Sequence, residues 1–242
     1  MRVGYLQFDP VFGDIERNLE TVTRLLAQAD ADLIVLPELF AAGYQFVSKS
    51  EVLQLAETGA RWPDHRAALR DAAPRMAIVA GLPERSGARC YNSAVIVGPS
   101  GLLGCHRKTN TIFFEETLFF DPGDSGFQVW DVGGAKVGVM ICFDWFYPES
   151  ARTLALMGAD IIAHPSNLVL PHCPDSMVTR CLENRVFSIT ANRIGSEARG
   201  GKDRLTFIGT SEVVSPRGKI LRRAPREAEE LAILAPSWLK PG

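Results

Sequence analysis

Short apolar runs, each stopped by a proline or by a reactive residue, recur along this chain and alternate with segments of helical periodicity. Residues 32–36 form one such run, which Pro37 stops, and residues 160–163 form another. A β-branched run of this length is typical of a strand buried on both faces. Asp14 opens a segment whose apolar residues have helical spacing: Ile15, Leu19, Val22, Leu25 and Leu26. The alternation of strand and helix predicts an α/β fold.

Other strands are expected to pair antiparallel with their neighbours. The turn at 98–101 separates apolar runs at 91–97 and 102–106, which indicates a hairpin. Further strands are predicted at 3–9, 76–80, 127–132, 136–141, 187–191, near 205–214, at 219–221 and at 231–234. Further helices are predicted from Pro63 to Pro74, at 149–157 after Pro148, and at 177–186. The predicted sheet is therefore mixed.

Length and composition favour one domain. The chain has 242 residues, of which 46% are hydrophobic and 22% charged, as in an ordinary soluble globular protein. It contains neither a repeat nor a linker of low complexity. We therefore expect a single domain over residues 1–242, with a short C-terminal tail.

Charge and hydropathy limit the partners. The formal charge of −2 provides no large basic face, so nucleic acid is not expected as a partner. The sequence has no signal-peptide core and no uncharged apolar run of the length that spans a membrane. We expect a cytoplasmic protein that does not associate with a membrane.

The five cysteines are odd in number and irregularly spaced, which fits neither a disulfide framework nor a zinc site. Each is therefore interpreted as a lone thiol. His164, His172 and Cys173 lie close in sequence, but their spacing matches no standard metal site. Neither a metal nor another cofactor is predicted.

Three chemically capable residues, Glu38, Lys108 and Cys142, lie at or just beyond the ends of predicted strands, where α/β sheets form ligand sites. Each also has a simpler interpretation: a solvated loop charge for Glu38, a basic surface cluster over 106–108 for Lys108, and an inert buried thiol for Cys142. The helix predicted at 149–157 favours a reactive Cys142, because its N-terminal partial positive charge would stabilise a thiolate.

Three sequence blocks carry a resemblance to a known family. They are Leu36-Pro37-Glu38-Leu39-Phe40 with Gly43-Tyr44, then Arg107-Lys108, then Val139-Met140-Ile141-Cys142-Phe143-Asp144 with Pro148-Glu149. In this order and spacing they resemble the nitrilase (carbon-nitrogen hydrolase) superfamily, from Met1 to about Leu221. The resemblance implies a four-layer α-β-β-α sandwich. It also implies that Glu38 is the general base, Cys142 the nucleophile, and Lys108 the cation that stabilises the tetrahedral intermediate.

The resemblance extends to further site residues. A second catalytic glutamate belongs to the family's pattern, and the register before the turn at 119–123 favours Glu116 over Glu115. The segment 164–168 is similar to the family's site-wall loop, which implies that Asn167 faces the pocket. Tyr44, Phe143 and Trp145 are expected to contact the substrate. An aromatic wall is expected from Tyr44, Phe113, Phe114 and Trp145.

The expected reaction is hydrolysis of a small amide or N-carbamoyl amine through an acyl-cysteine, with release of ammonia. The alternatives are a nitrile-hydrolysing nitrilase and a non-catalytic member that acts as a binding subunit. The loop at 143–148 has no arginine, which disfavours anionic substrates. Family members usually associate through the helix at 149–157, so a homodimer is expected, with a reduced contribution from the short C-terminal tail.

Overall fold

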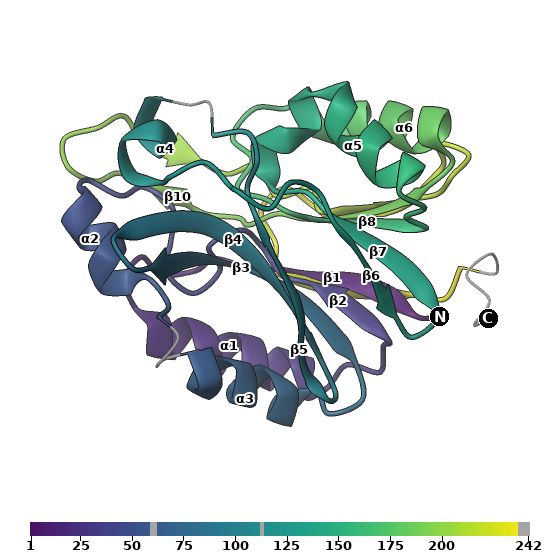
Figure 1. Ribbon diagram of the computed structural model, residues 1–242, viewed down its shortest axis with the longest axis horizontal. Helices are drawn as coiled ribbons and strands as arrows, with labels where there is room; N and C mark the ends of the chain where they lie inside the picture. Colours follow the sequence, from purple (N-terminus) through teal and green to yellow (C-terminus); the bar gives the residue numbers. More distant parts are fainter. Residues whose placement is uncertain (59–61, 112–113, 237–242) are drawn as a thin grey trace.

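The computed structural model describes residues 1–58, 62–111 and 114–236, and its strands form two large mixed sheets (Figure 1). The first sheet has the order β14 (Glu230–Leu234), β1 (Val3–Gln7), β2 (Leu33–Val35), β3 (Ala77–Ser86), β4 (Arg89–Gly98) and β5 (Gly101–Arg107). Strands β1, β2 and β3 are parallel, and the others pair antiparallel. The hairpin predicted around the turn at 98–101 is confirmed.

The second sheet repeats this design. Its order is β13 (Ile220–Arg223), β12 (Glu212–Val214), β9 (Phe187–Ala191), β8 (Ile161–Pro165), β7 (Ala135–Val139) and β6 (Val129–Val132), with β7, β8 and β9 parallel. A separate small ribbon pairs β10 (Ser196–Glu197) with β11 (Leu205–Thr206). The single strand predicted near 205–214 is therefore wrong, because its two ends belong to different sheets.

Helices cover the outer face of each sheet (Figure 1). Helices α1 (Ile15–Leu26) and α3 (Trp62–Ala72) lie on the first sheet, and α5 (Pro148–Leu156) and α6 (Cys173–Asn184) on the second. The short helices α2 (Lys49–Leu55), α4 (Phe114–Phe119) and the 3₁₀ helix η1 (Cys142–Phe146) complete the described helices. The four-layer α-β-β-α sandwich is confirmed.

Strand β2 shows how the apolar runs produce this layering. Leu33 and Val35 pack into the core between the two sheets, while Ile34 packs into the core beneath α1 and α3. All three are fully buried, because successive side chains of a strand point to opposite faces. The prediction of a strand buried on both faces is confirmed.

Three helices differ from the sequence predictions. Helix α6 was predicted at 177–186 but begins at Cys173 and ends at Asn184, because Pro174 fits the first helical turn and Arg185 takes a left-handed conformation. Helix α4 was not among the helices predicted from sequence. Helix α2 was not predicted, although the Ser48 hydroxyl accepts from the backbone N–H of Glu51 at 3.1 Å in a Ser-x-x-Glu pattern that marks a helix start.

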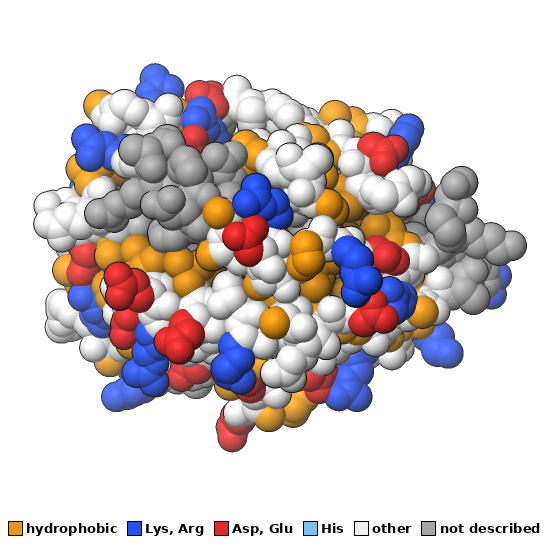
Figure 2. Space-filling view, turned by 90° about the horizontal axis from the view of Figure 1, so that it is seen from below, with side chains coloured by type: hydrophobic (Ala, Val, Ile, Leu, Met, Phe, Trp, Pro, Cys, Tyr) orange, Lys and Arg blue, Asp and Glu red, His pale blue; other side chains and the backbone are white. Residues whose placement is uncertain are grey.

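The surface around α1 and α3 carries basic and acidic side chains intermixed, as Figure 2 shows. This distribution agrees with the small net charge of the chain. Among the described helices, none has the length and apolar character needed to cross a membrane.

Candidate active site

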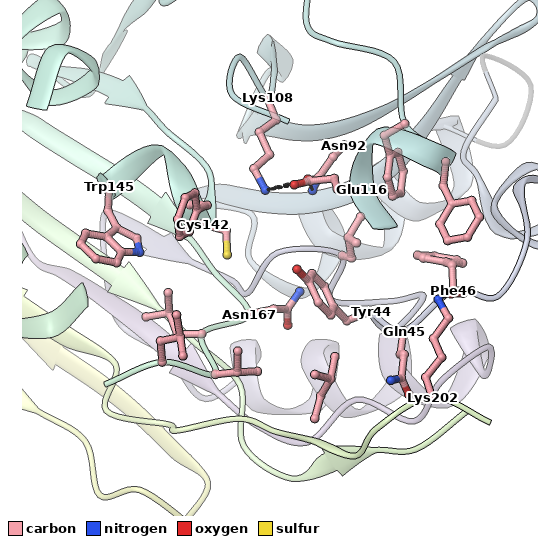
Figure 3. Close-up of a pocket in the computed structure, with 18 of the residues that line it drawn as sticks. Tyr44, Gln45, Phe46, Asn92, Lys108, Glu116, Cys142, Trp145, Asn167 and Lys202 are labelled. Atoms are coloured by element: carbon pink, nitrogen blue, oxygen red, sulfur yellow. Dashed lines mark hydrogen bonds and ion pairs between the residues drawn. The ribbon is translucent and has the colours of Figure 1, made fainter. Parts of the chain in front are cut away.

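The four residues predicted to be catalytic meet at the end of the two sheets where the parallel strands terminate. Figure 3 shows three of them, Lys108, Glu116 and Cys142, around one cavity. Glu38 follows β2, Lys108 follows β5, Cys142 follows β7, and Glu116 lies on α4. All four are buried, with 1% exposure for Lys108 and Glu38. The interpretations of Glu38 and Lys108 as surface charges are therefore wrong.

Lys108 is the centre of the charged cluster. Its Nζ donates to Glu116 Oε1 at 2.6 Å and Oε2 at 2.9 Å, and to Glu38 Oε1 at 3.2 Å. Burial opposes the charged form of Lys108, but the charges of Glu116 and Glu38 outweigh it and raise the Lys108 pKa well above its ordinary value. The ammonium is thus fixed as a cation. The glutamate on Lys108 is Glu116, and the side chain of Glu115 lies outside the described part of the chain.

Asn92, on β4, is a site residue that the sequence reasoning missed. Its Nδ2 donates to Glu38 Oε1 at 2.7 Å and to Glu116 Oε1 at 2.8 Å, so one amide holds both carboxylates. The backbone carbonyl oxygen of Asn92 accepts from the backbone N–H of Lys108 at 2.8 Å. The available signal was the polar pair Asn92-Ser93 inside an otherwise apolar strand.

The second oxygen of Glu38 makes no hydrogen bond within the charged cluster. Glu38 Oε2 is buried and has no hydrogen-bond partner among the described residues. A buried carboxylate oxygen without a donor is costly in a folded protein, and such exceptions occur at reactive sites. This oxygen is therefore available to take a proton.

Cys142 is held as a thiol. Burial, reinforced by the charge of Glu38, raises the Cys142 pKa well above its ordinary value, although Lys108 and a hydrogen bond from the Asn167 backbone act in the opposite direction. The thiolate expected from the following helix is therefore not the resting form. Attack by this sulfur requires a base that removes its proton.

The backbone at Cys142 is in the left-handed region, with φ of 45°. Asp144 supports this turn, since its Oδ2 accepts from the Ile141 N–H at 2.8 Å and its Oδ1 from Asn110 Nδ2 at 2.8 Å. Burial raises the Asp144 pKa to about 6. Left-handed non-glycine residues are strained and persist where neighbours fix them, often at active sites. Asp144 thus ties the Cys142 turn to the segment that follows Lys108.

His164, on β8, also fixes this turn. Its Nε2 lies 2.8 Å from the Cys142 carbonyl oxygen, and its Nδ1 lies 3.1 Å from the Thr190 hydroxyl. The two other residues considered above as metal ligands are His172 and Cys173. His172 is exposed, and Cys173 is the first residue of α6. No group of three potential ligands for a metal occurs in the described ranges.

A cavity of about 390 Å³ opens beside the Cys142 sulfur. All four residues predicted to bind substrate line it: Tyr44, Phe143, Trp145 and Asn167. Asn167 Nδ2 also donates to the Glu38 carbonyl oxygen at 2.8 Å, which joins the site-wall loop to the carboxylate segment. Of the remaining predicted aromatic wall, Phe113 and the side chain of Phe114 lie outside the described residues.

Glycines allow the close approach of the segments that carry the site. A Cβ at Gly81 would lie 2.5 Å from the Cα of Glu38, and a Cβ at Gly123 would meet the carbonyl oxygens of Arg107 and Lys108. Backbone contacts of this kind require glycine. The sites of Glu38 and Lys108 are therefore fixed by backbone packing as well as by their hydrogen bonds.

Comparison with known proteins assigns the chain to a family. The model of the carbon-nitrogen hydrolase family matches residues 2–235. The chain is 46% identical to a nitrilase of Pyrococcus abyssi, with 96% of this chain and 88% of the relative covered. It is 33% identical to an (R)-stereoselective amidase of a Pseudomonas species, with 94% and 82% covered.

A solved structure agrees in fold. The amidase of Nesterenkonia sp. AN1 in complex with acrylamide is 26% identical and superposes with a TM-score of 0.84, covering 97% of this chain and 89% of that chain. The fold, the buried Glu38–Lys108 pair and these similarities lead to one conclusion. The chain belongs to the carbon-nitrogen hydrolase (nitrilase) family and is an enzyme of the nitrilase and amidase type.

Proposed function

We propose that this enzyme hydrolyses a small amide or N-carbamoyl amine through an acyl-cysteine at Cys142 and releases ammonia. One observation carries the proposal: an unpartnered, buried oxygen of Glu38 accompanies a buried thiol that needs a base. Cys142 lines a cavity large enough for an organic amide, and Glu38 is hydrogen-bonded to Lys108, which lines the same cavity.

In the first half of the reaction, Glu38 Oε2 accepts the thiol proton while the Cys142 sulfur attacks the carbonyl carbon. The negative charge that develops on the substrate oxygen is stabilised by Lys108 Nζ and by the backbone N–H of Phe143. When the tetrahedral intermediate collapses, the C–N bond breaks and Glu38 returns its proton to the departing nitrogen. Ammonia leaves, and Cys142 carries a thioester when the substrate is an amide or a thiocarbamate when it is an N-carbamoyl amine.

In the second half, water attacks the carbonyl carbon of this thioester or thiocarbamate. Glu38 accepts a proton from this water, and the C–S bond breaks as the proton passes to the Cys142 sulfur. Glu116 keeps the Lys108 ammonium in place through both of its oxygens. The site therefore returns to its resting charges after each turnover.

Nitriles are the second candidate substrates, because a relative with 46% identity is named a nitrilase. The residues after the nucleophile favour amides. Family members that prefer nitriles commonly have Cys-Trp-Glu at this point, whereas this chain has Cys142-Phe143-Asp144, which is more similar to amidases and carbamoylases.

Matched substrates test the proposal. Ammonia release is measured with butyramide, butyronitrile, N-carbamoylbutylamine and N-carbamoyl-alanine, with Cys142→Ala as the blank. We expect a higher kcat/KM for the amide or the carbamoyl amine than for the nitrile or the carboxylate-bearing compound. A tenfold preference for the nitrile would replace this proposal with nitrile hydrolysis, and full activity in Cys142→Ala would remove the thiol mechanism.

We also propose that the enzyme is a homodimer that associates through α5. The proposal is supported by the exposure of apolar side chains at the end of this helix, with Leu156 80% exposed. Sedimentation equilibrium should give twice the mass of one chain, and Leu156→Asp should reduce that mass to one chain. A wild-type monomer at micromolar concentration would contradict the proposal.

A further inference from the structure

The cavity extends well beyond the groups that react. In Figure 3, Trp145 lies on one side of Cys142, while Gln45, Phe46 and Lys202 lie across the cavity on the other. Because a water molecule occupies about 30 Å³ in the liquid, a cavity of about 390 Å³ holds on the order of ten waters. The reacting amide group fills only a small part of this space, so the remainder can receive the rest of the substrate.

The far end of the cavity is aromatic and rigid. Phe46, Phe119 and Phe120 line it, and we call these three residues the aromatic end. Phe46 and Phe120 meet edge to face with ring centroids 5.8 Å apart, and Phe46 also packs edge to face on Phe12. Phe46 and Phe120 are almost completely buried in the folded chain. This surface exists before a substrate binds.

Two polar side chains beside the aromatic end, Lys202 and Gln45, already have partners within the protein. Lys202 Nζ donates to the Phe46 carbonyl oxygen at 2.9 Å and lies 5.3 Å from the centroid of the Phe119 ring. Gln45 Nε2 donates to the Asp203 carbonyl oxygen at 2.9 Å. A charged substrate group placed here would lose its hydration and would have to compete with the contacts that Lys202 and Gln45 already make. The aromatic end therefore offers a ligand mainly apolar surface.

From this geometry we propose that the natural substrate carries an uncharged apolar chain or ring on its carbonyl carbon, and that the aromatic end binds that group. The inference rests on the proposed hydrolase function and specifies its substrate class. A chain on the order of five carbons fills the space left by the amide. Since burial of one methylene contributes about 0.8 kcal/mol, each added carbon is expected to raise kcat/KM about fourfold until the aromatic end is reached.

A chain-length series tests the inference in the wild-type enzyme. The kcat/KM values are measured for acetamide, butyramide, hexanamide and 3-phenylpropanamide, and for two charged amides of matching length, 6-aminohexanamide and adipamic acid. We expect a rise on the order of 10²-fold from acetamide to hexanamide. We also expect hexanamide to exceed both charged compounds.

Two variants on α4 locate the effect. Phe119→Ala should lower kcat/KM for hexanamide about tenfold more than for acetamide, because it removes part of the aromatic end. Leu118→Ala is the matched control, since Leu118 lies on the same helix, is 67% exposed and does not line the cavity. It should give the wild-type chain-length series.

The outcomes separate this inference from the proposed function. Equal kcat/KM for acetamide and hexanamide, or a tenfold advantage of either charged amide, would overturn the aromatic end as an apolar subsite while leaving the hydrolase standing. If amides were inert but the matching nitriles gave the same rise with chain length, amide hydrolysis would fail and the apolar subsite would stand.

Discussion

The Nε2 atom of His164 lies 2.8 Å from the carbonyl oxygen of Cys142, so this buried histidine holds the backbone of the candidate nucleophile. Burial lowers the His164 pKa to about 4, which keeps the ring neutral. A neutral ring that donates from Nε2 accepts at Nδ1, where the Thr190 hydroxyl lies 3.1 Å away. His164 therefore acts on the left-handed turn of Cys142.

His164→Ala should lower kcat about tenfold or more with little change in KM, because the strained Cys142 turn loses a fixed hydrogen bond. Alkylation of Cys142 by iodoacetamide should slow in parallel. His164→Gln, which keeps an N–H donor, should recover part of both rates, and the exposed His172→Ala should match wild type. Unchanged alkylation in His164→Ala would show that the contact does not position the sulfur.

Glu38→Gln and Lys108→Ala should each leave a folded protein whose kcat is lower by about 10²- to 10⁴-fold, because the proposed base or the proposed oxyanion donor is lost. Both residues are buried in one ion cluster, so thermal melts must accompany the kinetics. The melts should remain cooperative. Near-wild-type kcat in a folded Glu38→Gln variant would exclude Glu38 as the base.

Asn92→Leu should lower kcat by about 10²-fold, because both carboxylates lose the amide that holds them. Thermal melts of Asn92→Leu accompany the kinetics, so that a loss of folding is distinguished from a loss of kcat. The control is Ser93→Ala on the same strand, whose hydroxyl instead donates to Glu84 at 2.7 Å. A loss of stability with an unchanged kcat would make Asn92 purely structural.

The strand ends were predictable from sequence because hydrophobic runs and the prolines beside them are local signals. Pro37 stops β2 immediately before Glu38, and Cys142 follows the apolar residues of β7. Parallel strands bring such ends to the same edge of the molecule. The resemblance of three sequence blocks to the family then indicated that Glu38, Lys108 and Cys142, which are 70 and 34 positions apart, belong to one site.

The groups that support the site were not predictable in the same way. Asn92 and His164 act through contacts across long sequence separations, and neither belongs to a local pattern that specifies a partner. From the sequence, the helix that follows Cys142 favoured a thiolate as its protonation state. Burial and the charge of Glu38 decide it instead, and both arise only in the folded chain.

His106 makes the stability of the protein sensitive to acid. It is buried, stacks on Phe127 with ring centroids 5.5 Å apart, and burial lowers its pKa from 6.5 to about 4. Between these pH values the unfolded chain binds the extra proton, so stability falls as the pH drops from 6.5 to 4. Relative to His106→Phe, the wild-type free energy of unfolding should fall by about 3 kcal/mol over this range.

Urea unfolding at pH 6.5, 5 and 4 measures this difference. The exposed His172→Phe is the control and should keep the wild-type dependence. A constant difference between wild type and His106→Phe across these pH values would contradict the assignment to His106.

Glu197 positions the segment that carries Tyr44. Its Oε2 accepts from the Gln45 N–H at 2.6 Å, both its oxygens lie 3.2 Å from the Tyr44 nitrogen, and Arg193 pairs with it in a buried ion pair. Glu197→Gln replaces one acceptor oxygen with a donor and removes one of the two carboxylate charges that Arg193 faces, the other being that of Asp9. The backbone at Tyr44 and Gln45 should then loosen, although the Glu38, Lys108 and Cys142 groups stay in place.

The expected result is a KM for butyramide raised about tenfold, with a smaller change in kcat, because the cavity wall rather than the reacting groups is disturbed. Removing one partner of a buried pair typically costs about 3 to 5 kcal/mol, so Glu197→Gln should also lower the free energy of unfolding measured in urea. The exposed Glu227→Gln should change neither quantity. If Glu197→Gln instead lowered kcat by as large a factor as Cys142→Ala does and left KM unchanged, Glu197 would act on the chemical step. Its assignment to the cavity wall would then be wrong.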